Sequence, residues 1–417
     1  MREWLNLVIQ KSLRHAVEGH FIRRIREEID RWIGCFARAL MRNTVTVQEN
    51  KVLFHTQEDR YCCNQKYICE EFRKRGLENV DLVYVISSKG KNNSVPHDVR
   101  TVRRGKFEYY QEMFSAKYIL TNSILYKDSP FKLKKEQILF ETWHGSLGIK
   151  RFDKNSYKSS YRWVRGAINT GKMTSFCISN SSFEDAVYRD SYWPKNPILR
   201  FGHPRNDIMF ENHAEHRAAV KKAFLEKHEL DNDTRFIMYG PTFRDSKNFD
   251  CYNLDIDGVL DAAEKHFGGK WILLLRYHMT LRKVYKSRDQ LNDGKNMRVI
   301  DVTDYDDMQE LMTIADIAIT DYSSWIYDFV LQRKPGFIFA TDIELYNNER
   351  GFYYSLEETP FPVAVNNEQL INNILSFESK PYLDAVEVFL EDKGCVEDGN
   401  ASKRVVEKIL EMMEAQS

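Results

Sequence analysis

The sequence predicts an α/β protein with two doubly wound parallel-sheet domains that face a cleft, preceded by an amphipathic helical segment. Three observations support this prediction. Short apolar runs alternate with helical patterns, which is typical of parallel sheets covered on both faces. The alternation restarts near Asn196, in the Pro-containing stretch 193–197 where the domain boundary is expected. The length of 417 residues fits two domains or one large one.

The amino-terminal segment 1–42 has a helical pattern. Apolar residues recur at steps of three and four from Leu5 to Leu40 and form one continuous stripe. Nine Arg and Lys against five Asp and Glu give the segment a net charge of +4. A cationic amphipathic helix can lie on an anionic membrane surface. A helix packed on the body of the protein or on a partner subunit shows the same stripe, so both interpretations stay open.

The first domain is expected over 43–197. A helical pattern over 62–75 ends at Gly76, a favoured residue just after a helix. Ser182 is expected to cap a helix that follows the last strand of this half. The runs that predict strands are 51–55, 81–87, 118–121, 137–140 and 174–179.

The second domain is expected over 198–417. Its final helix, 401–413, is a candidate to pack back on the first domain. Two doubly wound domains that face each other place a ligand cleft at the carboxyl ends of their strands. The predicted strands are 236–239, 271–275, 298–300, 317–320 and 337–339, with helices near 254–267, 307–315 and 324–332.

Composition and charge exclude several classes of protein. Lys plus Arg and Asp plus Glu both number 61, and a net charge of zero argues against a nucleic-acid partner. No apolar run approaches the roughly 20 residues that cross a bilayer. The first residues do not resemble a signal peptide, so a cytosolic compartment is expected. The seven cysteines lack the paired spacing of a zinc site and are expected to be free thiols.

His144 is the candidate catalytic residue. It follows the predicted strand 137–140 and precedes Gly145, where the backbone can come close to a substrate. A histidine with a pKa near neutrality can transfer protons at such a strand end. The alternative is a histidine that only anchors the loop through hydrogen bonds.

Three strand ends of the second half carry candidate phosphate-binding residues. Hydroxyls and guanidinium groups bind phosphate oxygens, and a helix start attracts anions. Each single case could instead be a structural ion pair or a helix cap, but together they predict a diphosphate pocket. Neither a Walker A loop nor a G-x-G-x-x-G motif occurs, and Asp255 and Asp257 are interpreted as a helix cap rather than a metal site. The candidates are Thr242, Arg244, Arg276, His278, Asp321, Ser323 and Ser324.

Several motifs, in this order along residues 80–390, resemble the CDP-glycerol:poly(glycerophosphate) glycerophosphotransferase family of teichoic acid synthesis. Each is weak alone, and their combination is specific. They are Thr142–Gly145, Gly202–Asp207, Gly240–Asp245, Arg276–His278, Ile319–Ser324, Lys334–Pro335 and the stretch from Asp342 to Phe352.

The resemblance implies a GT-B fold, no metal or other cofactor, and peripheral attachment to the cytoplasmic face of the cell membrane. It also implies transfer of glycerol phosphate or ribitol phosphate from a CDP-alditol to a hydroxyl of a lipid-linked acceptor, with CMP released. His144 matches the family's proposed general base. The residues that match its donor-phosphate positions are Arg276, His278, Ser323 and Ser324, and Arg244 and Asp321 fall in matching motifs.

The loop after His144 departs from the family pattern because it lacks the proline of many members. The resemblance implies that this loop, with Gly145, Ser146 and Lys150, faces the acceptor. The identity of the acceptor is therefore left open. The number of units added and a possible homo-oligomeric state are also left open. The alternative functions are a GT-B glycosyltransferase or epimerase that uses a UDP-sugar, and an inactive membrane-associated scaffold.

Overall fold

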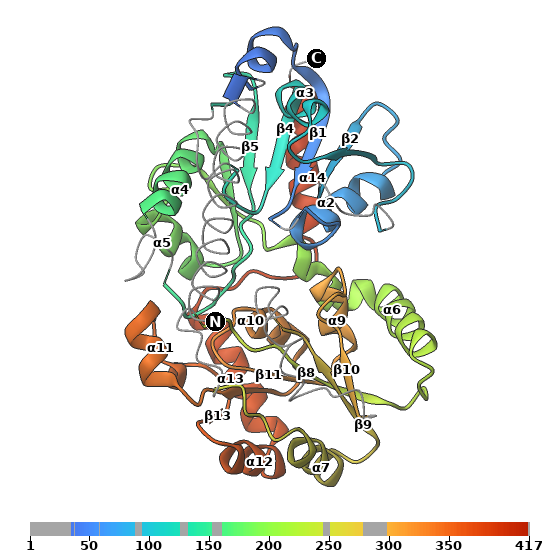
Figure 1. The fold of residues 1–417 in the computed structure, drawn as a ribbon, viewed down its shortest axis with the longest axis vertical. Helices are drawn as coiled ribbons and strands as arrows, with labels where there is room; N and C mark the ends of the chain where they lie inside the picture. Colours follow the sequence, from blue (N-terminus) through green and yellow to red (C-terminus); the bar gives the residue numbers. More distant parts are fainter. Residues whose placement is uncertain are drawn as a thin grey trace, which may run out of the picture.

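A computed structural model describes residues 35–36, 38–57, 59–87, 94–125, 132–151, 161–244, 251–277 and 298–415. These residues form two separate sheets, and every pair of neighbouring strands is parallel. Figure 1 shows one sheet above the other along the long axis of the molecule. The predicted α/β fold with two parallel sheets is confirmed.

The first sheet lies in the order β3-β2-β1-β4-β5-β6-β7, so the chain reverses direction across the sheet between β1 and β4. Such a switch point leaves a crevice at the carboxyl ends of the two strands. The strands are β1 (Gln48–His55), β2 (Asp81–Ile86), β3 (Arg100–Arg103), β4 (Ala116–Thr121), β5 (Ile138–Glu141), β6 (Phe176–Ser179) and β7 (Ile198–Arg200).

The second sheet lies in the order β10-β9-β8-β11-β12-β13, with its switch point between β8 and β11. Its central strands are almost continuously apolar, as expected for strands covered on both faces. The strands are β8 (Arg235–Tyr239), β9 (Trp271–Leu275), β10 (Val299–Asp301), β11 (Ile317–Thr320), β12 (Gly336–Phe339) and β13 (Val363–Ala364).

Helices cover both sheets, and their starts test two of the predicted caps. Asp255 accepts a hydrogen bond from the Gly258 backbone N–H at 3.1 Å, which confirms it as a cap. The helix after β6 is capped by Ser181, not by Ser182 as predicted, because the Ser181 hydroxyl accepts from the Glu184 N–H at 3.1 Å. The helices are α2 (Cys63–Lys74), α3 (Phe107–Ser115), α4 (Tyr161–Met173), α5 (Ser182–Asp190), α6 (Ala214–Lys227), α7 (Ile256–Phe267), α9 (Met308–Ile314), α10 (Trp325–Phe329), α11 (Ile343–Arg350), α12 (Asn367–Leu375), α13 (Ser379–Asp392) and α14 (Ala401–Glu414).

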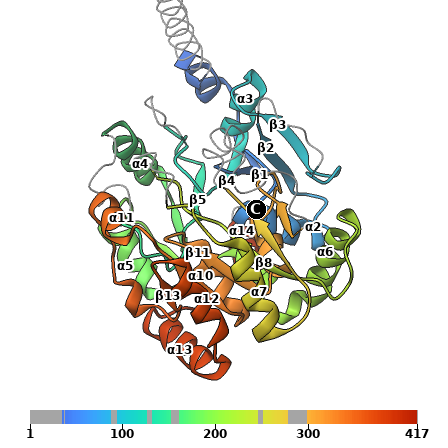
Figure 2. The same cartoon turned by 60° about the horizontal axis from the view of Figure 1, so that its bottom comes forward.

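Helix α14 returns from the second sheet to the first. Figures 1 and 2 both show it beside α2. Its residues Val405 and Ile409 are fully buried in one core cluster with Phe54 of β1 and Phe72 of α2. The carboxylate of Asp207, in the connection between the sheets, accepts the first backbone N–H groups of α14 at 2.9 and 2.7 Å. The core of the first sheet is thus completed by residues near 405.

The predicted amino-terminal helix lies mostly outside the described residues. Residues 38–44 are helical, and Arg38 lies over the ring of Tyr110 on α3 at 5.9 Å. Phe36 and Leu40 face outward, with 70% and 40% of their surface exposed. None of the described helices is long and apolar enough to cross a membrane.

Candidate functional site

A cleft of about 580 Å³ lies between the carboxyl ends of the two sheets. Thr56 and Asn122 line it from the ends of β1 and β4, and Gly240 and Ser323 line it from the ends of β8 and β11. Both switch points therefore open into one cleft, where α/β proteins of this topology bind their ligands.

His144 follows β5 and lines this cleft. Its Nδ1 lies 2.6 Å from the backbone carbonyl of Asn122. Because a carbonyl can only accept, Nδ1 carries the hydrogen and Nε2 keeps its lone pair. Burial lowers the pKa of His144 to about 4, with Arg205 and Lys150 acting in the same direction and the hydrogen bond to Asn122 opposing them. The imidazole is therefore neutral at pH 7, as a general base requires.

The residue before His144 holds an unusual backbone conformation. Trp143 has a φ of +50°, in the left-handed region that few bulky residues adopt. Its backbone N–H donates to the buried Glu141 carboxylate at 2.9 Å, and its ring stacks on the His144 imidazole with centroids 4.5 Å apart. These contacts fix where the imidazole points.

The loop after His144 touches the second half of the molecule. Gly145, Ser146 and Lys150 all line the cleft. A Cβ added to Gly148 would lie 2.7 Å from the Cβ of Ser324, so only glycine permits this approach.

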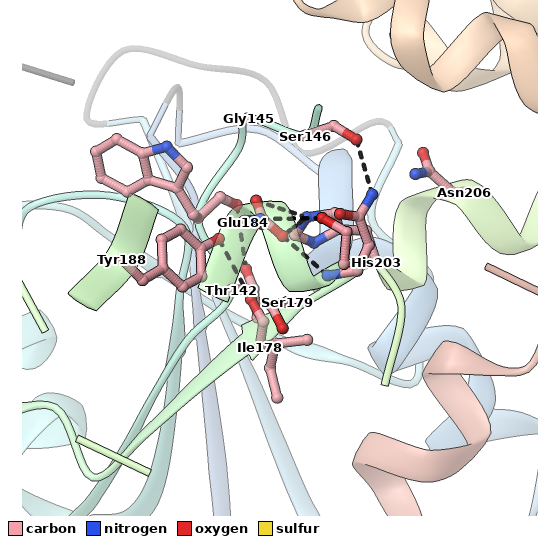
Figure 3. Close-up of polar contacts among 12 residues, drawn as sticks. Thr142, Gly145, Ser146, Ile178, Ser179, Glu184, Tyr188, His203 and Asn206 are labelled. Carbon is pink, nitrogen blue, oxygen red and sulfur yellow. Dashed lines mark hydrogen bonds and ion pairs between the residues drawn. The ribbon is translucent and has the colours of Figure 1, made fainter. Parts of the chain in front are cut away.

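Ser146 is held by a polar network beneath the loop (Figure 3). The Asn180 side chain donates to the Ser146 hydroxyl at 2.8 Å and to Glu397 at 3.1 Å. Glu397 also accepts the backbone N–H of His203, whose ring lies 2.9 Å from Glu184. Burial raises the pKa of Glu397 to about 7. The network joins the predicted acceptor side of the cleft to the connection between the sheets.

Thr242, Arg276, Ser323 and Ser324 line the opposite side of the cleft. Two backbone carbonyls, 2.9 and 2.8 Å away, hold one guanidinium nitrogen of Arg276. Ser324 precedes α10, but its side chain makes no capping hydrogen bond. Hydroxyl and guanidinium donors therefore gather opposite His144, an arrangement that suits phosphate oxygens.

Arg244 and Asp321 are arranged differently from the expected direct phosphate contacts, and neither is among the lining residues. The Arg244 guanidinium is 4% exposed and lies 2.8 Å from Asp321 and 2.7 Å from Asp342. Asp321 also accepts the backbone N–H of Thr242 at 2.9 Å. The two carboxylates occupy the guanidinium, so this buried cluster supports the Thr242 loop from behind.

One predicted site residue lies outside the described part of the chain. His278 lies outside the described residues, so its role stays a prediction. No group of three His, Cys, Asp or Glu that could hold a metal ion occurs in the described ranges.

Arg205 and Asp328 also line the cleft, and sequence reasoning gave neither a role. The Arg205 guanidinium lies 2.9 Å from the Asp328 carboxylate and forms an ion pair with it. The signal available for Arg205 was its place in the motif Gly202–Asp207, shortly after β7.

Two parallel sheets whose switch points share one cleft, with a neutral histidine facing hydroxyl and guanidinium donors, define a GT-B-like transferase. The profile of the CDP-glycerol:poly(glycerophosphate) glycerophosphotransferase family matches residues 36–411. The chain belongs to this family and is an enzyme of its phosphotransferase class. The predicted family and enzyme class are thereby confirmed.

Similar proteins include a teichoic acid poly(glycerol phosphate) polymerase of Bacillus spizizenii, 27% identical over 87% of this chain and 92% of that one. A teichoic acid glycerol-phosphate transferase of Staphylococcus aureus is 25% identical over 85% and 91%. A variant of the wall teichoic acid polymerase TagF, soaked with CDPG, has a TM-score of 0.77 at 25% identity, covering 95% of this chain and 98% of that one. The chain spans about half the length of the glycerol phosphate polymerases of Staphylococcus epidermidis and Bacillus subtilis.

Proposed function

We propose that this chain transfers an alditol phosphate from a CDP-alditol to a hydroxyl of a lipid-linked acceptor, releasing CMP, in the synthesis of teichoic acid or a related polymer. The family assignment supports the CDP-alditol donor. Relatives named for glycerol phosphate and for ribitol phosphate match similar shares of the chain, so the proposal includes both alditols.

The reaction begins with the acceptor hydroxyl beside His144. The Nε2 lone pair takes the hydroxyl proton, while Nδ1–H stays bonded to the Asn122 carbonyl. The acceptor oxygen attacks the β-phosphorus, which carries the alditol. The bond from this phosphorus to the bridging oxygen breaks, and CMP leaves with the electron pair.

The donor diphosphate lies against the other side of the cleft. Thr242, Arg276, Ser323 and Ser324 bind its oxygens and stabilise charge on the leaving phosphate. His278 is proposed to join them from the segment after β9. Arg244 and Asp321 contribute by fixing the Thr242 loop.

The single observation that carries this proposal is the neutral His144, with Nε2 available, across one cleft from the phosphate-binding side chains. The test measures nucleotide release from CDP-glycerol, CDP-ribitol and a UDP-sugar, with a lipid-linked acceptor present. We expect CMP from a CDP-alditol, and a loss of roughly 10²- to 10⁴-fold in His144→Ala. The control is His266→Ala, an exposed histidine on α7.

Two results would contradict the proposal. Release of UDP would support the glycosyltransferase or epimerase alternative, and no release from any donor would support the scaffold. The epimerase alternative has a fold-level likeness only: a UDP-GlcNAc 2-epimerase of Methanocaldococcus jannaschii has a TM-score of 0.51 at 14% identity. Near-normal turnover in His144→Ala would remove His144 from the mechanism.

A lipid-linked acceptor requires the cleft to reach a membrane surface, and we propose that this surface is the cytoplasmic face. We propose that the basic segment 1–42 attaches the protein there. Nine Arg and Lys supply attraction to anionic lipids, and the apolar stripe supplies a face to bury. At the end of this segment, Arg38 and Met41 are buried while Phe36 and Leu40 face outward. The end of the segment is therefore packed on the body of the protein while it still presents apolar side chains to the outside.

A further inference from the structure

An ion pair crosses the cleft beneath the His144 loop. Arg205 comes from the connection between the sheets, and Asp328 belongs to α10 in the second half. Their side chains are 4% and 2% exposed, and the guanidinium lies 2.9 Å from the carboxylate. Asn206 donates to the other carboxylate oxygen of Asp328 at 3.1 Å. Neighbouring residues of the connection thus hold both oxygens of one carboxylate.

The same guanidinium holds the His144 loop. Its Nη2 donates to the Gly145 carbonyl at 2.6 Å. The backbone N–H of Arg205 donates at 3.0 Å to Asn64, which in turn donates to the carbonyls of Thr142 and Trp143 at 3.2 and 3.0 Å. The carbonyls on both sides of His144 are thus fixed by Arg205 or by its direct partner.

Asp328 lies close in sequence to the opposite side of the cleft. Ser323 and Ser324, which line that side, immediately precede α10, and Asp328 is the last residue but one of this short helix. The ion pair is therefore a direct polar link between the loop of the proposed base and the helix that follows the residues proposed to bind phosphate.

We propose that Arg205 and Asp328 are positioning residues, which hold His144 in line with the start of α10 across the cleft. The expected change in rate rests on the proposed function, whereas the expected change in the titration of His144 does not. The pair touches neither reacting atom and acts through the Gly145 carbonyl on one side and through α10 on the other.

Arg205 also acts on the charge state of His144, and Asp328 is the counter-charge of Arg205. Arg205 and Lys150 both lower the pKa of His144. The other ionisable groups around it are Glu141 at the end of β5 and Cys63, Glu184 and Asp328, which line the same cleft. Loss of the Arg205 charge should raise the pKa of His144, whereas loss of the Asp328 charge should lower it further. These opposite shifts report the charges of the pair, while the rate reports the position of His144.

The experiment compares Arg205→Met, Arg205→Lys and Asp328→Asn by two measurements. The first follows the His144 imidazole by NMR during a pH titration of the intact protein without substrate. The second records CMP release from CDP-glycerol as a function of pH. Arg333→Met is the matched control, because Arg333 pairs with Glu387 on the surface away from the cleft lining.

We expect the titration of His144 to move to higher pH in Arg205→Met and to lower pH in Asp328→Asn, with the control unchanged. The rate should fall by about 10²-fold in Arg205→Met, the effect of misplacing a catalytic group by about 1 Å. Arg205→Lys keeps the charge but loses the planar fork, so its rate should fall while the titration stays near wild type. This variant also serves if Arg205→Met does not fold.

Shifts in the same direction, or no shift with an unchanged rate, would overturn the inference. The NMR titration requires no turnover, so it separates this inference from the proposed function. If the His144 titration shifted in opposite directions but the wild-type protein released no CMP, the inference about Arg205 and Asp328 would stand and the proposed reaction would be refuted.

Discussion

Replacing Gly148 by alanine tests whether the two halves of the molecule meet at the cleft. The new Cβ would lie 2.7 Å from the Cβ of Ser324 and 3.4 Å from its Cα. Carbon atoms in contact normally stand about 3.5–4.0 Å apart, so the loop or α10 must move by about 1 Å. Overpacking of this kind costs about 1–3 kcal/mol of stability. Because His144 and Ser323 lie on the two sides of this contact, a shift of about 1 Å should also lower the rate by about 10²-fold.

The assay is a double-mutant cycle with Ser324→Gly, which removes the atom that the new methyl group meets. Chemical denaturation gives the free energy of unfolding of the wild type, both single variants and the double variant. We expect Gly148→Ala to be destabilising alone and nearly neutral in the Ser324→Gly background. CMP release by Gly148→Ala reports the change in cleft geometry. Wild-type stability and rate in Gly148→Ala would refute the reasoning, since the halves would then stand apart in solution.

Removal of Arg244 by Arg244→Met should destabilise the protein by about 3–5 kcal/mol, because the buried Asp321 and the partly buried Asp342 lose their counter-charge; a melting temperature equal to wild type would contradict this. EDTA should leave CMP release unchanged, because Arg276 and the hydroxyl groups proposed to bind the diphosphate supply its donors; inhibition reversed by magnesium or manganese would show a metal requirement. Changing Arg23, Arg24 and Arg26 to Glu should reduce flotation with anionic vesicles, since each basic residue contributes about 1 kcal/mol, while activity on a short soluble acceptor persists. Wild-type protein that fails to float would refute the membrane role.

The central strands could be predicted from the sequence because burial on both faces makes them almost continuously apolar. Trp271–Leu275, for example, has five buried residues and was predicted at its observed bounds. The edge strands β3, β7 and β13 were missed because they are short and only partly buried. β3 is Arg-Thr-Val-Arg and β13 has two residues, so neither forms an apolar run.

The candidate site could be predicted as far as the strand ends permit. His144, Thr242, Arg276 and Ser323 were chosen because they follow predicted strands, and all four line the cleft. Partners distant in sequence could not be inferred in this way.

The burial of Arg244 depends on Asp321 and Asp342, which lie in two later strand-to-helix connections. The role inferred for Arg205 likewise depends on Asp328, 123 positions later. Local patterns place a side chain at a strand end but do not show which carboxylate it will meet.

The return of α14 to the first sheet has a consequence for folding during synthesis. The ribosome makes β7 about 200 residues before α14, an interval of about 10–40 s at the usual rates of elongation. During that time, the nascent first sheet lacks Val405 and Ile409, and apolar residues such as Phe72 lack their final cover. A newly made first half therefore offers a surface for chaperones or for aggregation until α14 docks. Variants that weaken α14 should reduce the yield of folded protein more than its activity per molecule.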